Sequence, residues 1–118
     1  MRNFKELKIW KRSFKMANEI YKVTKSFPAE EKYALISQIR RSAVSIPSNI
    51  AEGCSRNSNK DLGRFVEIAI GSAFELETQL LIAKSQNFGN SKIDEIIDEI
   101  NQLQKMMNAF KSKLTPKT

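Results

Sequence analysis

Apolar residues recur at spacings of three and four along four segments of the chain, a spacing typical of α-helices that bury one face. The segments cover roughly residues 5–26, 30–53, 59–86 and 91–113. Helices of this size are about 30–40 Å long, and short connections between them favour antiparallel neighbours. The pattern therefore predicts an all-α protein whose residues 1–118 form one domain, an up-down antiparallel four-helix bundle.

Each segment has one main apolar stripe, which we expect to face the core of the bundle. The stripe of the first segment consists of Trp10, Phe14, Ala17, Tyr21 and Thr24. The stripe of the second consists of Ile36, Ile39, Ala43, Ile46 and Ile50. The third segment has Leu62, Phe65, Ala69, Ala73, Leu76, Leu80 and Ala83. The fourth has Ile93, Ile97, Ile100, Leu103, Met107, Phe110 and Leu114.

Capping and helix-breaking residues define the ends of these segments. A residue that precedes a proline is disfavoured in helical geometry, so Pro28 ends the first helix. Pro47 lies inside the second segment, but the apolar spacing keeps its phase across it, which indicates one bent helix rather than two. Gly53 can end that helix. Ser58 and Ser91 can cap the third and fourth helices.

The second and third segments also carry apolar residues outside their main stripes. These are Tyr33, Val44, Pro47, Ile70, Phe74 and Leu81. Either the core-facing arcs are wide, or a second subunit covers the extra residues. Because two segments show the feature independently, we expect a subunit interface. Glu77 lies between the two arcs of the third segment and should have a cationic partner, for which Arg40 is the candidate.

The residue types present argue against catalysis. General acid–base chemistry most often uses His, and the chain has none. Asp94, Asp98, Glu95 and Glu99 form i, i+4 carboxylate pairs that point away from the apolar stripe, so we expect a solvated face. The single Cys54 lacks a base and cannot form an internal disulfide or a zinc site. We therefore predict no catalytic residue, no metal, no cofactor and no enzymatic activity.

Hydropathy and cysteine usage bear on where the protein is found. No apolar run approaches the ~18 residues that suggest a membrane span, and no signal-peptide apolar region opens the chain. One unpaired Cys fits a reducing compartment. We expect a cytoplasmic protein without a membrane partner.

The charge is positive and lies mainly in the first half of the chain. The formal net charge is +7. Residues 1–60 carry 13 Lys and Arg against 5 Asp and Glu, whereas residues 61–118 carry 7 against 8. A one-sided positive field attracts nucleic acid or acidic surfaces without specifying which.

Two basic groups account for most of this excess. Lys5, Lys8, Arg12, Lys15 and Lys22 follow one face of the first segment, opposite Trp10 and Phe14. The second group, near the connection between the second and third segments, consists of Arg40, Arg41, Arg56, Lys60 and Arg64. Many charge rows are only solvated faces, but a soluble face usually mixes both signs. Such groups can neutralise phosphates without reading sequence. We expect no exposed aromatic cluster for base stacking.

One segment carries a specific motif. Residues 45–53 read SIPSNIAEG, and they follow QIRR at residues 38–41. Further matching stretches are IAIGSA at residues 68–73 and ELE at residues 75–77, and the match begins at Phe4, Leu7 and Trp10. This pattern resembles the signature of the 23S ribosomal RNA intervening-sequence proteins. The signature positions are Ser45, Ile46, Pro47, Asn49, Ile50, Ala51, Glu52 and Gly53.

The resemblance implies a four-helix protomer that assembles as a homopentamer. It also implies a relationship to the accessory protein of diversity-generating retroelements, a basic pentamer thought to engage nucleic acid and a reverse transcriptase. Asn49 and Glu52 could then cap or pair at the corner between the second and third helices, or at a subunit contact.

These observations lead to two functional hypotheses. The first is a non-enzymatic oligomeric scaffold that binds structured nucleic acid, RNA before DNA, through its basic residues. The alternative is a protein–protein adaptor whose basic face binds an acidic or polymerase-like partner.

Overall fold

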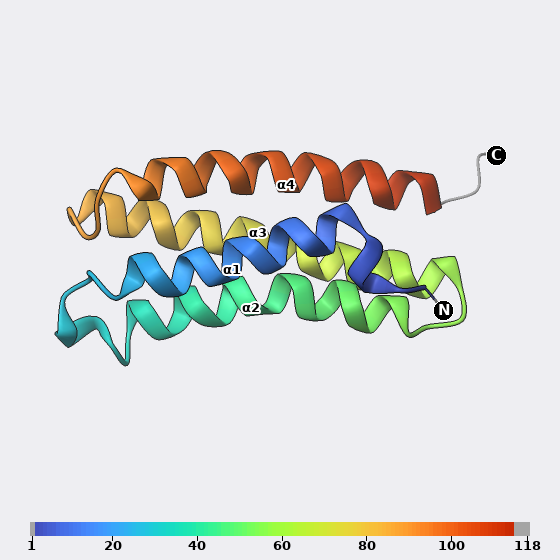
Figure 1. Cartoon of the computed structure of the whole chain (residues 1–118), viewed down its shortest axis with the longest axis horizontal. Helices are drawn as coiled ribbons and strands as arrows, with labels where there is room; N and C mark the ends of the chain where they lie inside the picture. Colours follow the sequence, from blue (N-terminus) through green and yellow to red (C-terminus); the bar gives the residue numbers. More distant parts are fainter. Residues whose placement is uncertain (1, 115–118) are drawn as a thin grey trace.

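The computed structural model describes residues 2–114 and is an all-α, up-down antiparallel four-helix bundle, as the sequence predicts (Figure 1). Its helices are α1 (Lys8–Thr24), α2 (Leu35–Cys54), α3 (Asn59–Ser85) and α4 (Lys92–Leu114). Two short 3-10 helices, η1 (Phe4–Glu6) and η2 (Ala29–Glu31), precede α1 and α2. The bundle measures 48 × 22 × 20 Å. Within residues 2–114, no helix is long and apolar enough to cross a membrane.

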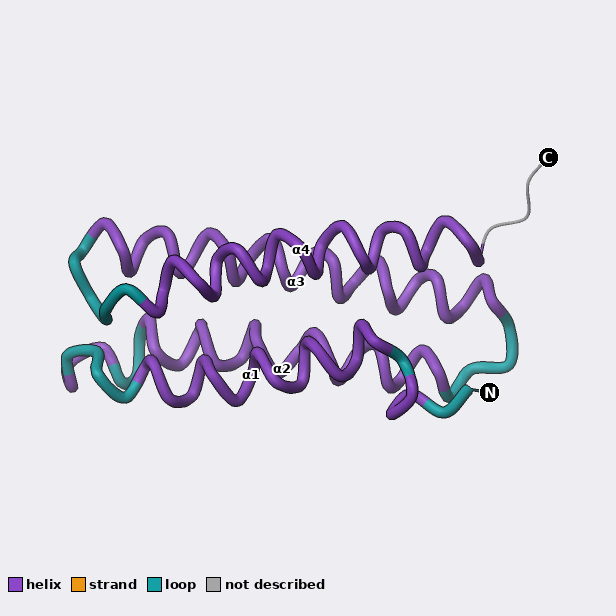
Figure 2. The backbone as a smooth tube through the Cα atoms, turned by 45° about the horizontal axis from the view of Figure 1, so that its top comes forward, coloured by secondary structure: helices purple, strands orange, loops and turns teal. Residues whose placement is uncertain are grey.

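Each helix packs against the two helices that flank it around the bundle. Helix α1 contacts α2 and α4, and α3 contacts the same two helices from the other side. Helices α1 and α3 therefore lie diagonally across the bundle. Figure 2 shows α1 and α2 as one layer and α3 and α4 as the other. Side chains of α1 and α3 consequently reach different outer faces of the molecule.

The core consists of the apolar stripes of all four helices. The predicted stripe of α2 is buried throughout, and the stripes of α3 and α4 are buried apart from Phe65, Ile97 and Phe110, which are half-buried. Burying these aliphatic side chains is the main force that holds the bundle together, at about 25 cal/mol per Å² of apolar surface.

The predicted stripe of α1 is wrong by about a quarter turn. Phe14 is 50% exposed and Tyr21 is 42% exposed, whereas the buried residues of α1 are Ile9, Ser13, Met16, Ala17, Ile20, Val23 and Thr24. Both sets have helical spacing, so periodicity alone could not choose between them. The buried aliphatic set meets the core, and the aromatic set faces outward beside α2.

The first two helices begin later than predicted. Leu7 is extended, with φ −76° and ψ 131°, and therefore separates η1 from α1. Residues 30–34, predicted to be helical, form a 3-10 turn and an irregular link, and Ala34 has φ −116° and ψ −103°. The α-helix starts only at Leu35, where the buried isoleucines of α2 begin.

The caps of α3 and α4 differ in how well they were predicted. The Ser58 hydroxyl accepts a hydrogen bond from the Asp61 backbone N–H at 3.1 Å, which confirms the cap of α3. At α4 the cap is Asn90 instead of Ser91, because the Asn90 side-chain oxygen accepts from the Lys92 N–H at 2.9 Å. The preceding turn places Gly89 at φ +79° against Phe27 and Ile93, a position that a side chain would strain.

The structure confirms that α2 is one helix across Pro47, whereas the helix end predicted at Gly53 lies one residue too early. Helix α2 runs through Pro47 without interruption, and the proline ring is buried. Gly53 does not end the helix, which continues to Cys54. A Cβ on Gly53 would lie 2.8 Å from Phe65 Cβ and 2.9 Å from Leu62 Cδ1, so glycine is required for α2 and α3 to approach this closely.

Candidate nucleic-acid interface

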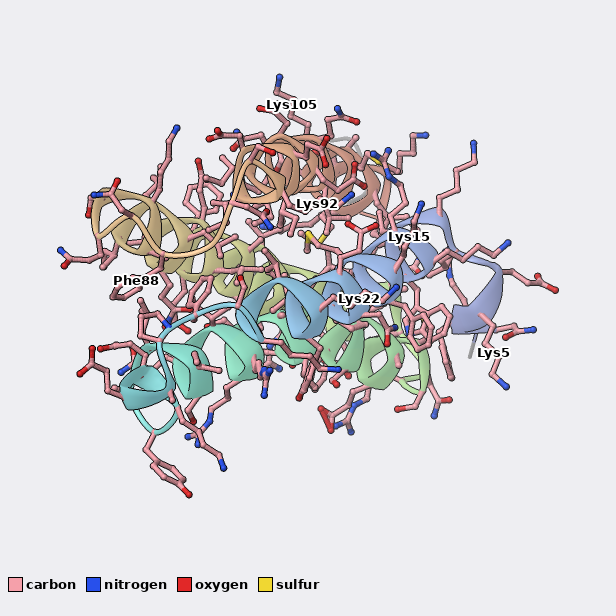
Figure 3. The ribbon with its side chains drawn as sticks, turned by 60° about the vertical axis from the view of Figure 1, so that its left-hand side comes forward. Lys5, Lys15, Lys22, Phe88, Lys92 and Lys105 are labelled. Atoms are coloured by element: carbon pink, nitrogen blue, oxygen red, sulfur yellow. The ribbon has the colours of Figure 1, made fainter. Side chains whose placement is uncertain are left out.

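The outer face of α1 carries a strip of exposed lysines. We call Lys8, Lys11, Lys15 and Lys22 the lysine strip; all four are exposed, and none forms an ion pair within residues 2–114. Figure 3 labels Lys15 and Lys22 along α1, and Lys5 at η1. From Lys8 to Lys22 the strip spans about 21 Å of helix. Lys11 belongs to it by position, although the predicted row did not include it.

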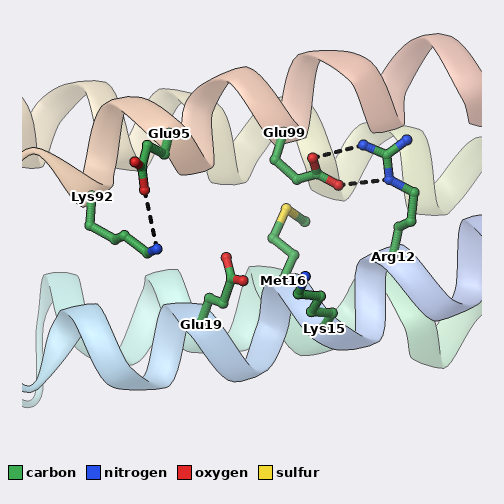
Figure 4. A pocket seen from close by; sticks show the side chains of 7 residues that line it. All are labelled: Arg12, Lys15, Met16, Glu19, Lys92, Glu95 and Glu99. Carbon is green, nitrogen blue, oxygen red and sulfur yellow. Dashed lines mark hydrogen bonds and ion pairs between the residues drawn. The ribbon is translucent and has the colours of Figure 1, made fainter.

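Arg12, predicted to bind nucleic acid, is instead engaged inside the protein. Its guanidinium donates to both carboxylate oxygens of Glu99 on α4, at 2.8 and 2.7 Å (Figure 4). It also donates to Gln102 Oε1 at 2.8 Å. The hydrogen bond with Glu99 raises the pKa of Arg12. This bidentate pair joins α1 to α4, and the prediction that Glu99 lies on a merely solvated face is wrong.

A polar cavity of about 350 Å³ lies beside this pair, between α1 and α4. Its lining alternates in charge and consists of Arg12, Lys15, Met16, Glu19, Lys92, Glu95 and Glu99. Lys92 pairs with Glu95 at 3.1 Å on the α4 side, while Glu19 and Lys15 extend from α1 (Figure 4). The opposite charges balance, so this cavity does not add to the positive field of the lysine strip.

The second predicted basic group is divided in the structure. Arg40 and Arg41 lie about 20 Å along α2 from its end at Cys54, and Arg56 follows that end. Arg40 covers the ring of Tyr21 at 4.6 Å and donates to the Thr24 hydroxyl at 2.9 Å, so it joins α2 to α1. The predicted partnership between Arg40 and Glu77 is wrong, because Glu77 accepts from Gln104 of α4 at 2.9 Å.

The other residues of the second predicted basic group lie at the end of the bundle where α2 connects to α3. Arg56 lies over the Phe65 ring at 4.9 Å, and Arg64 pairs with Asp61 at 3.6 Å. Lys60 is exposed and has no ion-pair partner within residues 2–114. A cleft of about 500 Å³ between α3 and α4 brings Lys60 and Arg64 close to Lys111, a cation that the sequence did not single out. Glu67 also lines the cleft and pairs with Lys111 at 3.4 Å, so of these three cations only Lys60 has no ion-pair partner within residues 2–114.

An apolar groove runs between α1 and α2. We call it the aromatic groove; it has a volume of about 410 Å³ and is lined by Phe4, Trp10, Phe14, Ala17, Asn18, Tyr21, Val44, Pro47, Ser48 and Ala51. The prediction that no aromatic cluster is exposed is therefore wrong. Trp10 stacks on Phe14 with ring centroids 4.9 Å apart. Trp10 also contacts Phe4 edge-on, whereas Phe14 itself is 50% exposed.

The predicted interface residues do not form one surface. Tyr33 is 88% exposed and lies apart, Val44 borders the aromatic groove, and Phe74 and Leu81 are exposed on α3. Ile70 is half-buried and packs against the core. Pro47 is classed with the buried residues, so its placement away from the main face of α2 was wrong.

The signature residues connect α2 to α3 through short hydrogen bonds. The Asn49 amide donates to the Ser45 carbonyl at 2.8 Å and to its hydroxyl at 2.9 Å. That hydroxyl meets the Ser72 hydroxyl of α3 at 2.8 Å. Ser42 donates to Glu75 at 2.9 Å one turn away. Glu52 is exposed, 4.0 Å from Arg56. The hydrogen bonds of Asn49 therefore lie within α2, and they support the Ser45 hydroxyl that meets α3.

Cys54 ends α2 in an apolar environment. Its side chain is buried, and the desolvation that burial causes raises the pKa of the thiol. Its backbone carbonyl accepts from the Arg2 N–H at 3.0 Å, which joins the N-terminal segment to the end of α2. The residue therefore packs as a small apolar group.

These features define the class of protein, which is a basic four-helix bundle with serine-rich contacts between α2 and α3. The chain belongs to the family described as 23S rRNA-intervening sequence protein, whose model matches residues 5–109. No curated protein sequence matches the chain.

A solved structure has the same fold. It is a protein of unknown function from the S23 ribosomal protein family of Bacteroides thetaiotaomicron VPI-5482, with a TM-score of 0.79 and 24% sequence identity. The alignment covers 88% of this chain and 95% of that chain. At this identity, the similarity establishes the fold alone.

Proposed function

We propose that this protein is a non-enzymatic, self-associating scaffold that binds structured RNA through the lysine strip of α1. The observation that carries the proposal is that these lysines are exposed along one helix face and free of ion pairs within residues 2–114. Arg12 is instead paired with Glu99, and Arg40 of α2 lies over the ring of Tyr21. Free ammonium groups can replace the counterions of phosphates on binding.

The length and chemistry of the strip suit a nucleic-acid backbone. Over about 21 Å of helix, a duplex presents on the order of a dozen phosphates. The strip has no hydrogen-bond acceptors or planar groups arranged to read base edges, so the contact should depend on shape and charge. The words 23S rRNA in the family description make structured RNA the first polyanion to test.

Titration of a labelled RNA stem-loop, followed by fluorescence anisotropy, tests the proposal. The variant carries Lys8→Glu, Lys15→Glu and Lys22→Glu. Its matched control carries Lys32→Glu, Lys105→Glu and Lys113→Glu, which change the net charge equally but lie outside α1. We expect the α1 variant to lose at least tenfold more affinity than the control. Arg12 stays unchanged, because its loss would also disturb the α1–α4 contact.

Two results would contradict RNA binding through α1. Equal losses in both variants would mean that only the overall field attracts RNA. Equal affinity for the stem-loop and for an acidic polypeptide, with binding that RNA does not compete away, would favour the protein–protein adaptor instead.

A further inference from the structure

Two charged side chains that line the polar cavity between α1 and α4 have no ion-pair partner within residues 2–114. They are the exposed ammonium group of Lys15 and the half-buried carboxylate of Glu19. The other charged residues of the lining are joined in two ion pairs. The cavity therefore offers one cation and one anion that the protein itself does not neutralise.

These two groups lie one helical turn apart on the same face of α1, and yet they do not pair with one another. The lysine precedes the glutamate, which is the less favourable order for an i, i+4 ion pair. Lys15 and Glu19 are therefore suited to a ligand that carries an anionic group and a set of hydrogen-bond donors a short distance apart. A nucleotide is such a ligand, because its phosphate is anionic and its base carries N–H donors.

The size and lining of the cavity suit one heterocyclic ring. Its volume of about 350 Å³ lies near the lower end of the ~300–1,000 Å³ that is typical of small-molecule sites. Met16 also lines the cavity and is buried, and Figure 4 shows its sulfur between Glu19 and Glu99. Thioether sulfur packs favourably against aromatic rings. Met16 therefore provides an apolar surface for a base beside polar walls.

The cavity adjoins the proposed path of the RNA backbone. Lys15 belongs both to the lysine strip and to the lining of the cavity. Lys22, the next lysine of the strip, lines a neighbouring cavity of about 290 Å³ that also includes Glu19 and Lys92. Sequence-specific recognition of RNA mostly targets unpaired nucleotides, whose bases can leave the stack. An unpaired nucleotide with its phosphate on Lys15 can therefore turn its base toward Glu19.

We propose that the polar cavity binds one unpaired guanine base of the RNA that the lysine strip holds. Guanine carries two adjacent donors, N1–H and the N2 amino group, which the two oxygens of the Glu19 carboxylate can accept together. Adenine, cytosine and uracil have no such pair of donors, so one of their acceptors would face the carboxylate. This inference rests on the proposed function, because the strip brings the nucleotide to the cavity.

Fluorescence-anisotropy titration with RNA stem-loops that share one stem and differ in the loop tests the inference. The reference loop contains uridines only, and a single guanosine replaces each loop position in turn. We expect the best guanosine loop to bind about tenfold more tightly than the reference, a discrimination typical of a bidentate base contact. Adenosine at that position should give no gain. Inosine, which lacks the N2 amino group, should give a smaller gain than guanosine.

Glu19→Gln tests whether this carboxylate reads the base. The variant keeps the size of the side chain but replaces one acceptor oxygen with an amino group, which would face a donor of guanine. We expect the preference for guanosine to disappear while binding to the uridine loop remains. The matched control is Glu30→Gln, which removes the same charge from an exposed residue of η2 and should keep the preference. Helical circular dichroism confirms that both variants are folded.

Chemical probing provides a second readout that does not depend on affinity. A dicarbonyl reagent modifies N1 and N2 of unpaired guanosine, which are the atoms that Glu19 is proposed to bind. At saturating protein, the loop guanosine should be protected by the unaltered chain and by Glu30→Gln. It should stay reactive in the complex with Glu19→Gln.

Two results would overturn the inference and leave the proposed function intact. The first is RNA binding that requires the lysine strip but has the same affinity for every loop. The second is a preference for guanosine that persists in Glu19→Gln, which would place base recognition elsewhere. Absence of binding to every stem-loop would contradict the proposed function itself, and the inference would fail with it.

Discussion

The α2–α3 contact and the α1–α4 contact lie on different sides of one bundle and are built from different chemistry. Between α2 and α3 the residues are small, with Gly53 against Phe65 and Ser45 against Ser72. Between α1 and α4 one bidentate ion pair, Arg12 with Glu99, adjoins a polar cavity of about 350 Å³. The first contact tolerates little added volume, whereas the second has room beside it.

This difference separates the residues that hold the fold from those proposed to act on a partner. The signature residues Ser45, Asn49 and Gly53 all serve the α2–α3 contact. The lysine strip follows the side of α1 that borders the α1–α4 contact. The signature therefore identifies the family through its packing, and it does not mark the proposed RNA-binding face.

The largest effect is expected from Gly53→Ala. The added Cβ would lie 2.8 Å from Phe65 Cβ, closer than such atoms come, so α2 and α3 must separate. We expect a loss of about 2 kcal/mol in the free energy of unfolding. The control is Gly63→Ala, where a Cβ meets no atom within 4 Å. The higher helix propensity of alanine should raise its free energy of unfolding by about 0.5–1 kcal/mol. Urea denaturation measures both, and equal stabilities would contradict the close contact.

A smaller effect is expected from Arg12→Ala. The variant removes the ion pair with Glu99, but both side chains are about one third exposed, so solvent screens the interaction. We expect a loss of about 1 kcal/mol, most of which should vanish when Glu99 is already Ala. Lys15→Ala, one turn away and unpaired, should change stability by less than about 0.5 kcal/mol. A double-mutant cycle without coupling would show that the pair does not hold α1 to α4.

Asn49→Ala tests the polar part of the α2–α3 contact. Its amide satisfies the Ser45 carbonyl and hydroxyl, and we expect its removal to cost about 1 kcal/mol of unfolding free energy. Ser48→Ala, an exposed neighbour on α2, is the control and should be nearly neutral. Unchanged thermal and urea unfolding for Asn49→Ala would assign this signature residue to some role other than packing.

The smallest effect concerns pH and Cys54. Because burial raises the pKa of the thiol, the native state holds the proton more tightly than the unfolded chain does. The thiol therefore contributes to the free energy of unfolding. This contribution is complete below the ordinary thiol pKa of about 8.5 and is lost as pH rises through the native pKa. The stability difference between the protein and Cys54→Ala should shrink with rising pH in this range. A thiol reagent should also react slowly until urea unfolds the chain, and fast reaction in the native state would contradict burial.

The sequence predicted the helical segments well because their buried stripes are aliphatic and strictly periodic. Ile36, Ile39, Ile46 and Ile50 all face the core as expected. Helix α1 was the exception, because its aromatic and aliphatic residues form two stripes with the same spacing. The larger aromatic stripe suggested the core, but Ile9, Met16 and Ile20 occupy it.

The candidate site was only partly predictable, because charge pairing depends on neighbours that are distant in sequence. Arg12 and Lys15 look equivalent along α1, yet Glu99, 87 residues away, engages only the arginine. Arg40 was likewise expected to meet Glu77 and instead contacts Tyr21 and Thr24. The aromatic groove between α1 and α2 could not be predicted, because it depends on how α1 is rotated about its axis. Periodicity did not determine that rotation.

The salt dependence of RNA affinity is the most direct test of the claim that the lysine strip contacts phosphates. The slope of log K against log salt concentration counts the counterions released, at about 0.7–0.9 for each neutralised phosphate. For Lys8→Gln, Lys15→Gln and Lys22→Gln together, we predict a slope smaller in magnitude by about 2–3 than that of the unaltered protein. Lys32→Gln, Lys105→Gln and Lys113→Gln together, which lie outside α1, should leave the slope unchanged. If both triple variants give the same slope, α1 does not contact the RNA backbone.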